Sequence, residues 1–105
     1  MKTLDNHIAE YLEYCELRKR LDNKTLKAYK IDLTQYIAFS YDFPDCLSRN
    51  SVDIFITNLH KQYKPKTVKR KIASLKAFFH YLEYKEILVE NPFNKLDIRF
   101  REAKL

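Results

Sequence analysis

The sequence predicts an all-α protein that folds as a single four-helix bundle with a short C-terminal helical turn or tail. Its 105 residues include no glycine and only three prolines, so the usual material of tight β-hairpin turns is missing. Apolar residues recur at steps of three and four, the spacing of one face of an α-helix. A chain of this length fits one domain, and its 46% hydrophobic residues supply one core.

Two helices are expected in the first half of the chain. The first begins at Asp5 or Asn6, either of which can cap it, and runs to about Arg20. The second is capped by Asp22 and covers residues 23–40. The inward side chains of the first are Ile8, Leu12 and Cys15 with Tyr11 alongside, and those of the second are Leu26, Tyr29, Leu33, Tyr36 and Ile37. The side chains expected to face away from the core on the second are Lys24, Lys27, Ala28, Ile31 and Gln35.

Two further helices follow a loop at residues 41–49. The third is capped by Asn50 or Ser51 and ends near Gln62, and the fourth starts at Pro65, which suits a first turn where a missing N–H costs nothing. The expected inward residues are Val52, Phe55, Ile56 and Leu59 on the third helix, and Val68, Ile72, Leu75, Phe79 and Leu82 on the fourth. After them we expect a turn with an apolar plug formed by Ile87, Leu88 and Val89, ended by Asn91-Pro92.

The fourth helix lies in the most basic stretch of the chain. Between Lys61 and His80 there are seven Lys or Arg residues and no acid. On a helical wheel the face opposite the apolar stripe holds Lys66, Arg70, Ala73, Ser74 and Ala77, with His80 and Tyr81 at its edges. Cations beside small side chains suit a helix laid in the major groove of DNA. The alternative is a solvated basic face with the alanines packed on another helix.

The overall charge agrees with a polyanionic partner. The net charge is +6 and the pI about 9.3, which favour nucleic acid without fixing the fold. The two cysteines, Cys15 and Cys46, are far apart in sequence and follow no secretory signal, and no apolar run approaches the roughly 20 residues of a membrane span. We therefore expect a reduced cytoplasmic protein with no membrane association.

Two blocks of the sequence resemble a known family. Residues 21–39 read LDNKTLKAYKIDLTQYIAF, and residues 65–82 read PKTVKRKIASLKAFFHYL, followed by Ile87 and Asn91-Pro92. Their order and separation are similar to those of the N-terminal core-binding domain of tyrosine recombinases, the phage integrase and Xer-type family. The resemblance covers about residues 4–97.

The resemblance implies a SAM-like helical bundle that clamps a recombination half-site, with its second and fourth helices toward the major groove. Double-stranded DNA is then the partner, together with a catalytic domain of the same parent chain and possible neighbouring recombinase protomers. The motif positions of the family fall on Thr25, Thr67, Arg70 and Ser74, whose expected role is phosphate contact or seating in the groove. To these DNA-binding residues we add their charged neighbours Lys24, Lys27, Lys66 and Lys71. The domain is expected over residues 1–97, with the start of a linker at 98–105. Asp22 stands where the family often has serine.

No catalytic residues are expected in this chain. In the family the tyrosine nucleophile and its arginine, lysine and histidine partners lie in a second domain, and no histidine here is followed three residues later by arginine. No cofactor is expected. The pairs His7–Glu10 and His80–Glu83 have metal-ligand spacing on a helix, but supporting carboxylates are not evident.

Two other functions compete with a recombinase DNA-binding domain. One is a stand-alone helical DNA-binding regulator. The other is a helical protein-interaction module whose basic face meets an acidic partner.

Overall fold

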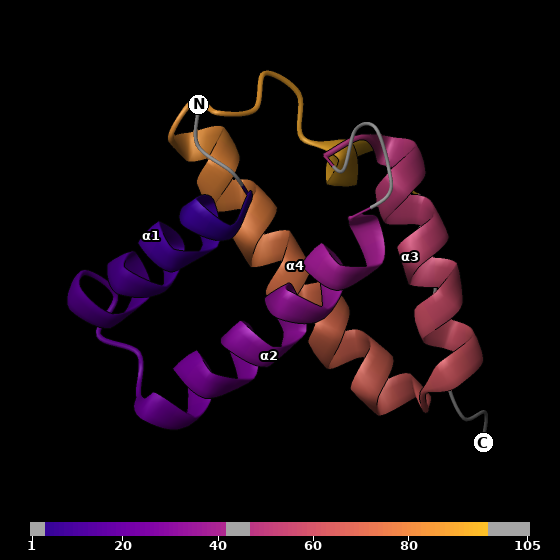
Figure 1. Ribbon diagram of the computed structural model, residues 1–105, viewed down its shortest axis with the longest axis horizontal. Helices are drawn as coiled ribbons and strands as arrows, with labels where there is room; N and C mark the ends of the chain where they lie inside the picture. The colour runs from indigo at the N-terminus through magenta and orange to yellow at the C-terminus, as the bar shows by residue number, and fades with distance from the viewer. Residues whose placement is uncertain (1–3, 42–46, 97–105) are drawn as a thin grey trace.

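The protein is an all-α bundle in which four helices surround one core (Figure 1). The computed structural model describes residues 4–41 and 47–96, and no strand occurs in that part of the chain. The helices are α1 (Leu4–Leu17), α2 (Asn23–Ser40), α3 (Arg49–Gln62) and α4 (Pro65–Tyr84), followed by the 3-10 helix η1 (Pro92–Lys95). The predicted fold class, including the C-terminal helical turn, is confirmed. Cys46 and the linker expected at 98–105 lie outside the described residues.

Local capping signals explain where α2 and α4 begin. The Asp22 carboxylate accepts a hydrogen bond of 2.8 Å from the Thr25 backbone N–H, and it thereby satisfies one of the free amides of the first turn. Pro65 occupies the first position of α4, as predicted. The cap predicted for α3 was wrong, because Ser48 rather than Asn50 or Ser51 precedes that helix and accepts from the Ser51 N–H.

Two chain reversals are made without glycine. Arg20 and Glu86 adopt left-handed backbone conformations with φ angles of 59° and 61°. Such a conformation costs a non-glycine residue roughly 1–2 kcal/mol. Beyond Arg20 the Leu21 N–H bonds to the Cys15 carbonyl, and this contact closes the end of α1. The predicted helix end at Arg20 was therefore three residues too late, because α1 ends at Leu17.

The predicted apolar stripes form the core. The described core residues exposed by no more than 7% are Ile8, Tyr11, Cys15, Leu33, Tyr36, Val52, Phe55, Ile56, Leu59, Val68, Ile72, Leu75, Phe78, Phe79, Tyr81 and Leu82. Aromatic rings contribute much of this core, and the Tyr36 ring meets the Phe55 ring edge-on at 4.9 Å between centroids.

The predicted apolar plug after α4 is wrong in detail. Val89 is fully exposed and Ile87 is 37% exposed, whereas Leu88 packs against the core. Phe93 of η1 fills the site instead, with its ring 5.4 Å from that of Phe79. Three successive apolar residues in a turn cannot all face one side, so the later aromatic residue takes the inward position.

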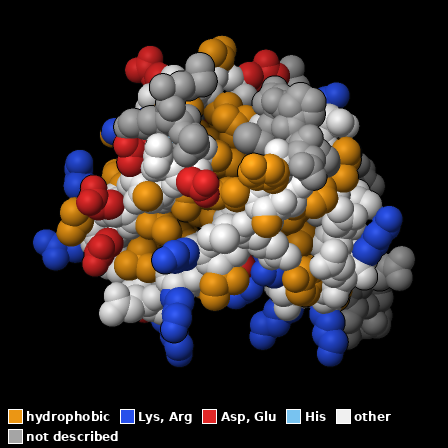
Figure 2. Space-filling model, in the orientation of Figure 1, with side chains coloured by type: hydrophobic (Ala, Val, Ile, Leu, Met, Phe, Trp, Pro, Cys, Tyr) orange, Lys and Arg blue, Asp and Glu red, His pale blue; other side chains and the backbone are white. Residues whose placement is uncertain are grey.

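The crossing of α2 and α4 determines which surface carries their N-terminal ends. The two helices contact each other near the centre of the molecule and begin at opposite corners of its lower edge (Figure 1). Lys and Arg side chains project from this lower edge, while most of the acidic side chains visible on this face lie along its top and left side (Figure 2). No helix in the described part of the chain has the length and apolarity that crossing a bilayer requires.

Candidate nucleic-acid interface

The two helices that start at the lower edge carry the same dipeptide at the same place. Lys24-Thr25 and Lys66-Thr67 are the second and third residues of α2 and α4. Both lysines are exposed and both threonines are half-buried. At a helix start the free backbone amides and the helix dipole favour an anion, so each lysine adds its charge where phosphate binding is already favoured.

The start of α4 has no side-chain cap. Lys64 occupies the N-cap position and makes no capping hydrogen bond, so no side chain takes the first amides of this helix. Neither α2 nor α4 has an acid in its first turn. The exposed basic residues of the two N-terminal halves are Lys24, Lys27, Lys30, Lys66, Lys69 and Arg70.

A hollow of about 390 Å³ lies between the start of α2 and the middle of α4. Its surface includes small or apolar side chains as well as two cations. The residues that line it are Asp22, Lys24, Thr25, Ala28, Tyr29, Arg70, Ala73 and Ser74. Four of the eight predicted DNA-binding residues therefore border this hollow: Lys24, Thr25 and Arg70, together with Ser74, which is itself only 2% exposed.

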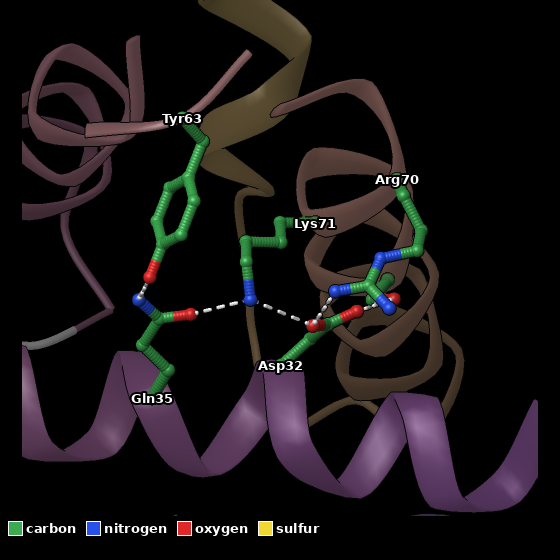
Figure 3. A network of polar contacts seen from close by, with 6 residues as sticks. Asp32, Gln35, Tyr63, Arg70 and Lys71 are labelled. Atoms are coloured by element: carbon green, nitrogen blue, oxygen red, sulfur yellow. Dashed lines mark hydrogen bonds and ion pairs between the residues drawn. The ribbon is translucent and has the colours of Figure 1, made fainter. Parts of the chain in front are cut away.

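Inside this surface a buried carboxylate joins α2 to α4 (Figure 3). The Asp32 side chain is 1% exposed. Its Oδ1 accepts from a terminal nitrogen of Arg70 at 3.0 Å and from Lys71 Nζ at 3.1 Å, and its Oδ2 accepts from the Ser74 hydroxyl at 2.7 Å. All three donors belong to α4, so one residue of α2 organises a full turn of the opposite helix.

Lys71 is directed into the protein from the other side of this network. Its Nζ also donates to Gln35 Oε1 at 2.7 Å, and it lies 5.1 Å from the centre of the Tyr63 ring. The Gln35 amide nitrogen donates to the Tyr63 hydroxyl at 2.9 Å. A lysine that is 7% exposed and fully engaged in this way is poorly placed to reach a ligand in solvent.

The structure thus divides the predicted site residues into two groups. The first group lies at the surface, and it contains Lys24, Thr25, Lys27, Lys66, Thr67 and Arg70. The second group is buried in the Asp32 network, and it contains Lys71 and Ser74. The outward orientation that the helical wheel gave Ser74 and Tyr81 was wrong, because these residues are 2% and 6% exposed.

Asp32 is the residue that sequence reasoning missed. It lies on the inward side of α2, next to Leu33 and one turn before Tyr36. A carboxylate on an otherwise apolar stripe predicts a buried cation as its partner, since an unpaired buried charge is very costly. That signal was present in the sequence, and the surplus of cations on α4 offered the partners.

Burial affects the protonation of three potential nucleophiles in the core. Burial raises the pKa of the Tyr11 and Tyr29 phenols and of the Cys15 thiol, so all three groups stay protonated near neutral pH. His7 Nδ1 lies 3.9 Å from Glu10, but no group of three potential metal ligands occurs in the described part of the chain.

Comparison with known proteins agrees with the resemblance in the two sequence blocks. The family model "Phage integrase, N-terminal SAM-like domain" matches residues 8–86. A tyrosine recombinase of Agathobacter rectalis is 55% identical over 103 residues, covering 97% of this chain and 34% of the relative. Tyrosine recombinase XerD of Listeria innocua is 31% identical over 100 residues, covering 90% of this chain and 34% of the relative.

A third relative is covered to a similar extent. Tyrosine recombinase XerC of Lacticaseibacillus casei is 32% identical over 98 residues, covering 88% of this chain and 33% of the relative. The chain thus spans about a third of the length of these curated relatives. No solved structure matches it. The chain belongs to the family of phage integrase N-terminal SAM-like domains, and the relatives described are tyrosine recombinases.

Proposed function

We propose that this chain is the DNA-binding core-binding domain of a site-specific tyrosine recombinase. The observation that carries the proposal is the pair of Lys-Thr helix starts that α2 and α4 bring to one basic edge of the molecule. Strand breakage and rejoining are then the work of a catalytic domain in the remainder of the recombinase, since the relatives are about three times as long as this chain. Neighbouring protomers on the same DNA are further partners in this proposal.

The first group of predicted site residues, which lies at the surface, supplies the DNA contacts. Lys66 and Arg70 on α4, together with Lys24 and Lys27 on α2, reach phosphates on either side of a groove. Thr67 adds a hydroxyl donor beside the start of α4. Thr25, whose side chain hydrogen-bonds to the Asp22 carboxylate, lines the hollow beside the start of α2. Lysine and arginine contacts release counterions, so with about four such contacts the slope of log K against log salt is expected between about −3 and −4.

Sequence readout by this domain is limited. Phosphate contacts fix orientation, whereas base edges carry the sequence information. Gln35, the glutamine on α2 that is chemically suited to adenine, accepts from Lys71 and donates to Tyr63 within the protein. Arg70 and the lysines remain as candidates for base contacts.

A fluorescence-anisotropy titration tests the proposal. Labelled duplex DNA of random sequence is titrated with the native chain and with Lys66→Glu, at low and at near-physiological salt. An acid in the first turn favours the helix dipole, so the variant should stay folded, and its DNA affinity should fall by about tenfold or more.

Lys85→Glu is the matched control, because Lys85 is also exposed and lies at the opposite end of α4. Both substitutions change the net charge equally, so a position-specific interface predicts a much smaller loss for Lys85→Glu. Equal losses in the two variants, or no binding by the native chain at low salt, would contradict the proposal. The latter result would favour a protein-interaction module.

A further inference from the structure

We propose that Asp32 is a positioning residue for DNA binding, which holds the Arg70 guanidinium at the surface where it meets the duplex. This inference rests on the proposed function and extends it to a buried residue that does not touch DNA. Asp32 also retains Lys71 inside the protein, so it determines which of the two adjacent cations on α4 is presented.

The geometry separates the two cations clearly. Arg70 gives one terminal nitrogen to Asp32 Oδ1, and its side chain is 50% exposed. Lys71 gives its ammonium to the same oxygen, but its side chain is only 7% exposed. A guanidinium has five N–H donors in a fixed fork, so Arg70 can bind Asp32 and still offer donors outward, as its half-exposed side chain allows. The lysine ammonium has three donors and is occupied by Asp32 and Gln35.

Ser74 completes the arrangement from the next turn of α4. Its hydroxyl is bonded to Asp32 Oδ2, which fixes the carboxylate plane and leaves Oδ1 for the two cations. The view in Figure 3 shows Arg70 and Lys71 approaching this carboxylate from different sides. Arg70 is therefore restrained before any ligand arrives, and the conformational entropy of ordering it on DNA is reduced.

A purely electrostatic role and a positioning role predict opposite effects of removing the Asp32 carboxylate on DNA affinity. A negative charge near a phosphate-binding surface weakens binding, so its removal by Asp32→Asn should strengthen DNA affinity. The positioning role predicts weaker affinity, although the variant is more positive by one unit. The sign of the change therefore distinguishes the two explanations.

The chain provides a matched control for this substitution. Asp53→Asn also removes one acid, but at an exposed position of α3 that does not line the hollow. Its DNA affinity should be equal to that of the native chain or a few fold tighter. Asp32→Asn should bind DNA about threefold to tenfold more weakly than the native chain, as expected when one long side chain must be ordered on binding.

A double-mutant cycle separates positioning from a general loss of structure. Arg70→Ala is measured in the native and in the Asp32→Asn background, with circular dichroism as the folding check. If Asp32 acts through Arg70, removing Arg70 costs clearly less affinity in the Asp32→Asn background. An equal cost in both backgrounds would overturn the inference.

A second variant keeps the test decisive if Asp32→Asn leaves Lys71 buried without a partner and the chain fails to fold. Asp32→Asn/Lys71→Met removes both buried charges and leaves the net charge at +6. Weaker DNA binding by this folded variant supports the positioning role, while native or tighter binding overturns it. If the native chain itself does not bind duplex DNA at low salt, the proposed function has failed, and the inference falls with it.

Discussion

The starts of α2 and α4 carry the same Lys-Thr pair, but the residues that cap them differ. At α2 the Asp22 carboxylate accepts a hydrogen bond of 2.8 Å from the Thr25 backbone N–H. At α4 the N-cap is Lys64, which makes no side-chain hydrogen bond. One free amide of the α2 start is thus already bonded to an acid of the protein, whereas the α4 start leaves its amides to water or to a ligand.

Stability and anion binding therefore compete for the same backbone groups at a helix start. A capped helix start is more stable on its own, and an uncapped one with lysines around it is a better phosphate site. In this account α4 is the principal DNA-facing helix and α2 is the supporting one.

The largest difference is expected between two charge reversals at equivalent positions. Lys66→Glu and Lys24→Glu each place an acid at the second residue of a helix, so both should preserve the fold. Lys66→Glu should weaken DNA binding by about tenfold or more, and Lys24→Glu by about threefold, because Asp22 already reduces the positive potential at α2. Anisotropy titration at one salt concentration measures both, and a larger effect at Lys24 would reverse the ranking.

Installing the missing cap should make the start of α4 similar to that of α2. In Lys64→Asp the new carboxylate can accept from the Thr67 N–H, so the melting temperature should rise by about a few degrees. DNA affinity should fall at the same time, since the amides are taken and one positive charge is reversed. Thermal melts and titrations on the same samples would show this opposition, and affinity that rises with stability would contradict it.

The smallest effect concerns the existing cap and its pH dependence. Hydrogen bonds from the Thr25 backbone and side chain lower the pKa of Asp22 below its ordinary value. A carboxyl with a lowered pKa in the folded state contributes stability above its unfolded pKa, and that contribution is lost as the pH falls through the folded value. The stability difference between the native chain and Asp22→Asn should therefore shrink between pH 7 and pH 3. A difference that grows on acidification would show that the cap is not the ionised carboxylate.

Capping chemistry made the bounds of α2 and α4 predictable from sequence. Asp22 and Pro65 are strong local signals, and both helices begin where those residues indicated. The end of α1 was missed because Arg20, not glycine, adopts the left-handed conformation after it. No residue type marked that turn, so the basic cluster at 18–20 appeared to belong to the last helical turn.

The candidate site was predictable only in part. A helical wheel assigns residues to faces, and it correctly placed Lys66 and Arg70 at the surface. It has no information on where another helix crosses, so it could not show that α2 covers Ser74 or that Lys71 folds back onto Gln35. Such cross-helix contacts depend on tertiary packing, and Asp32 was the one residue in the sequence that indicated them.

The most direct test of the account is the salt dependence of duplex binding by three proteins: the native chain, Lys66→Met and Lys71→Met. Each variant loses one positive charge, but Lys66 is exposed and Lys71 is 7% exposed. We predict that Lys66→Met reduces the slope of log K against log salt by about 0.9, the value of one phosphate contact, and that Lys71→Met leaves it unchanged. A shallower salt dependence for Lys71→Met than for Lys66→Met, or the same salt dependence for all three proteins, would contradict the claim that the exposed start of α4 contacts the DNA.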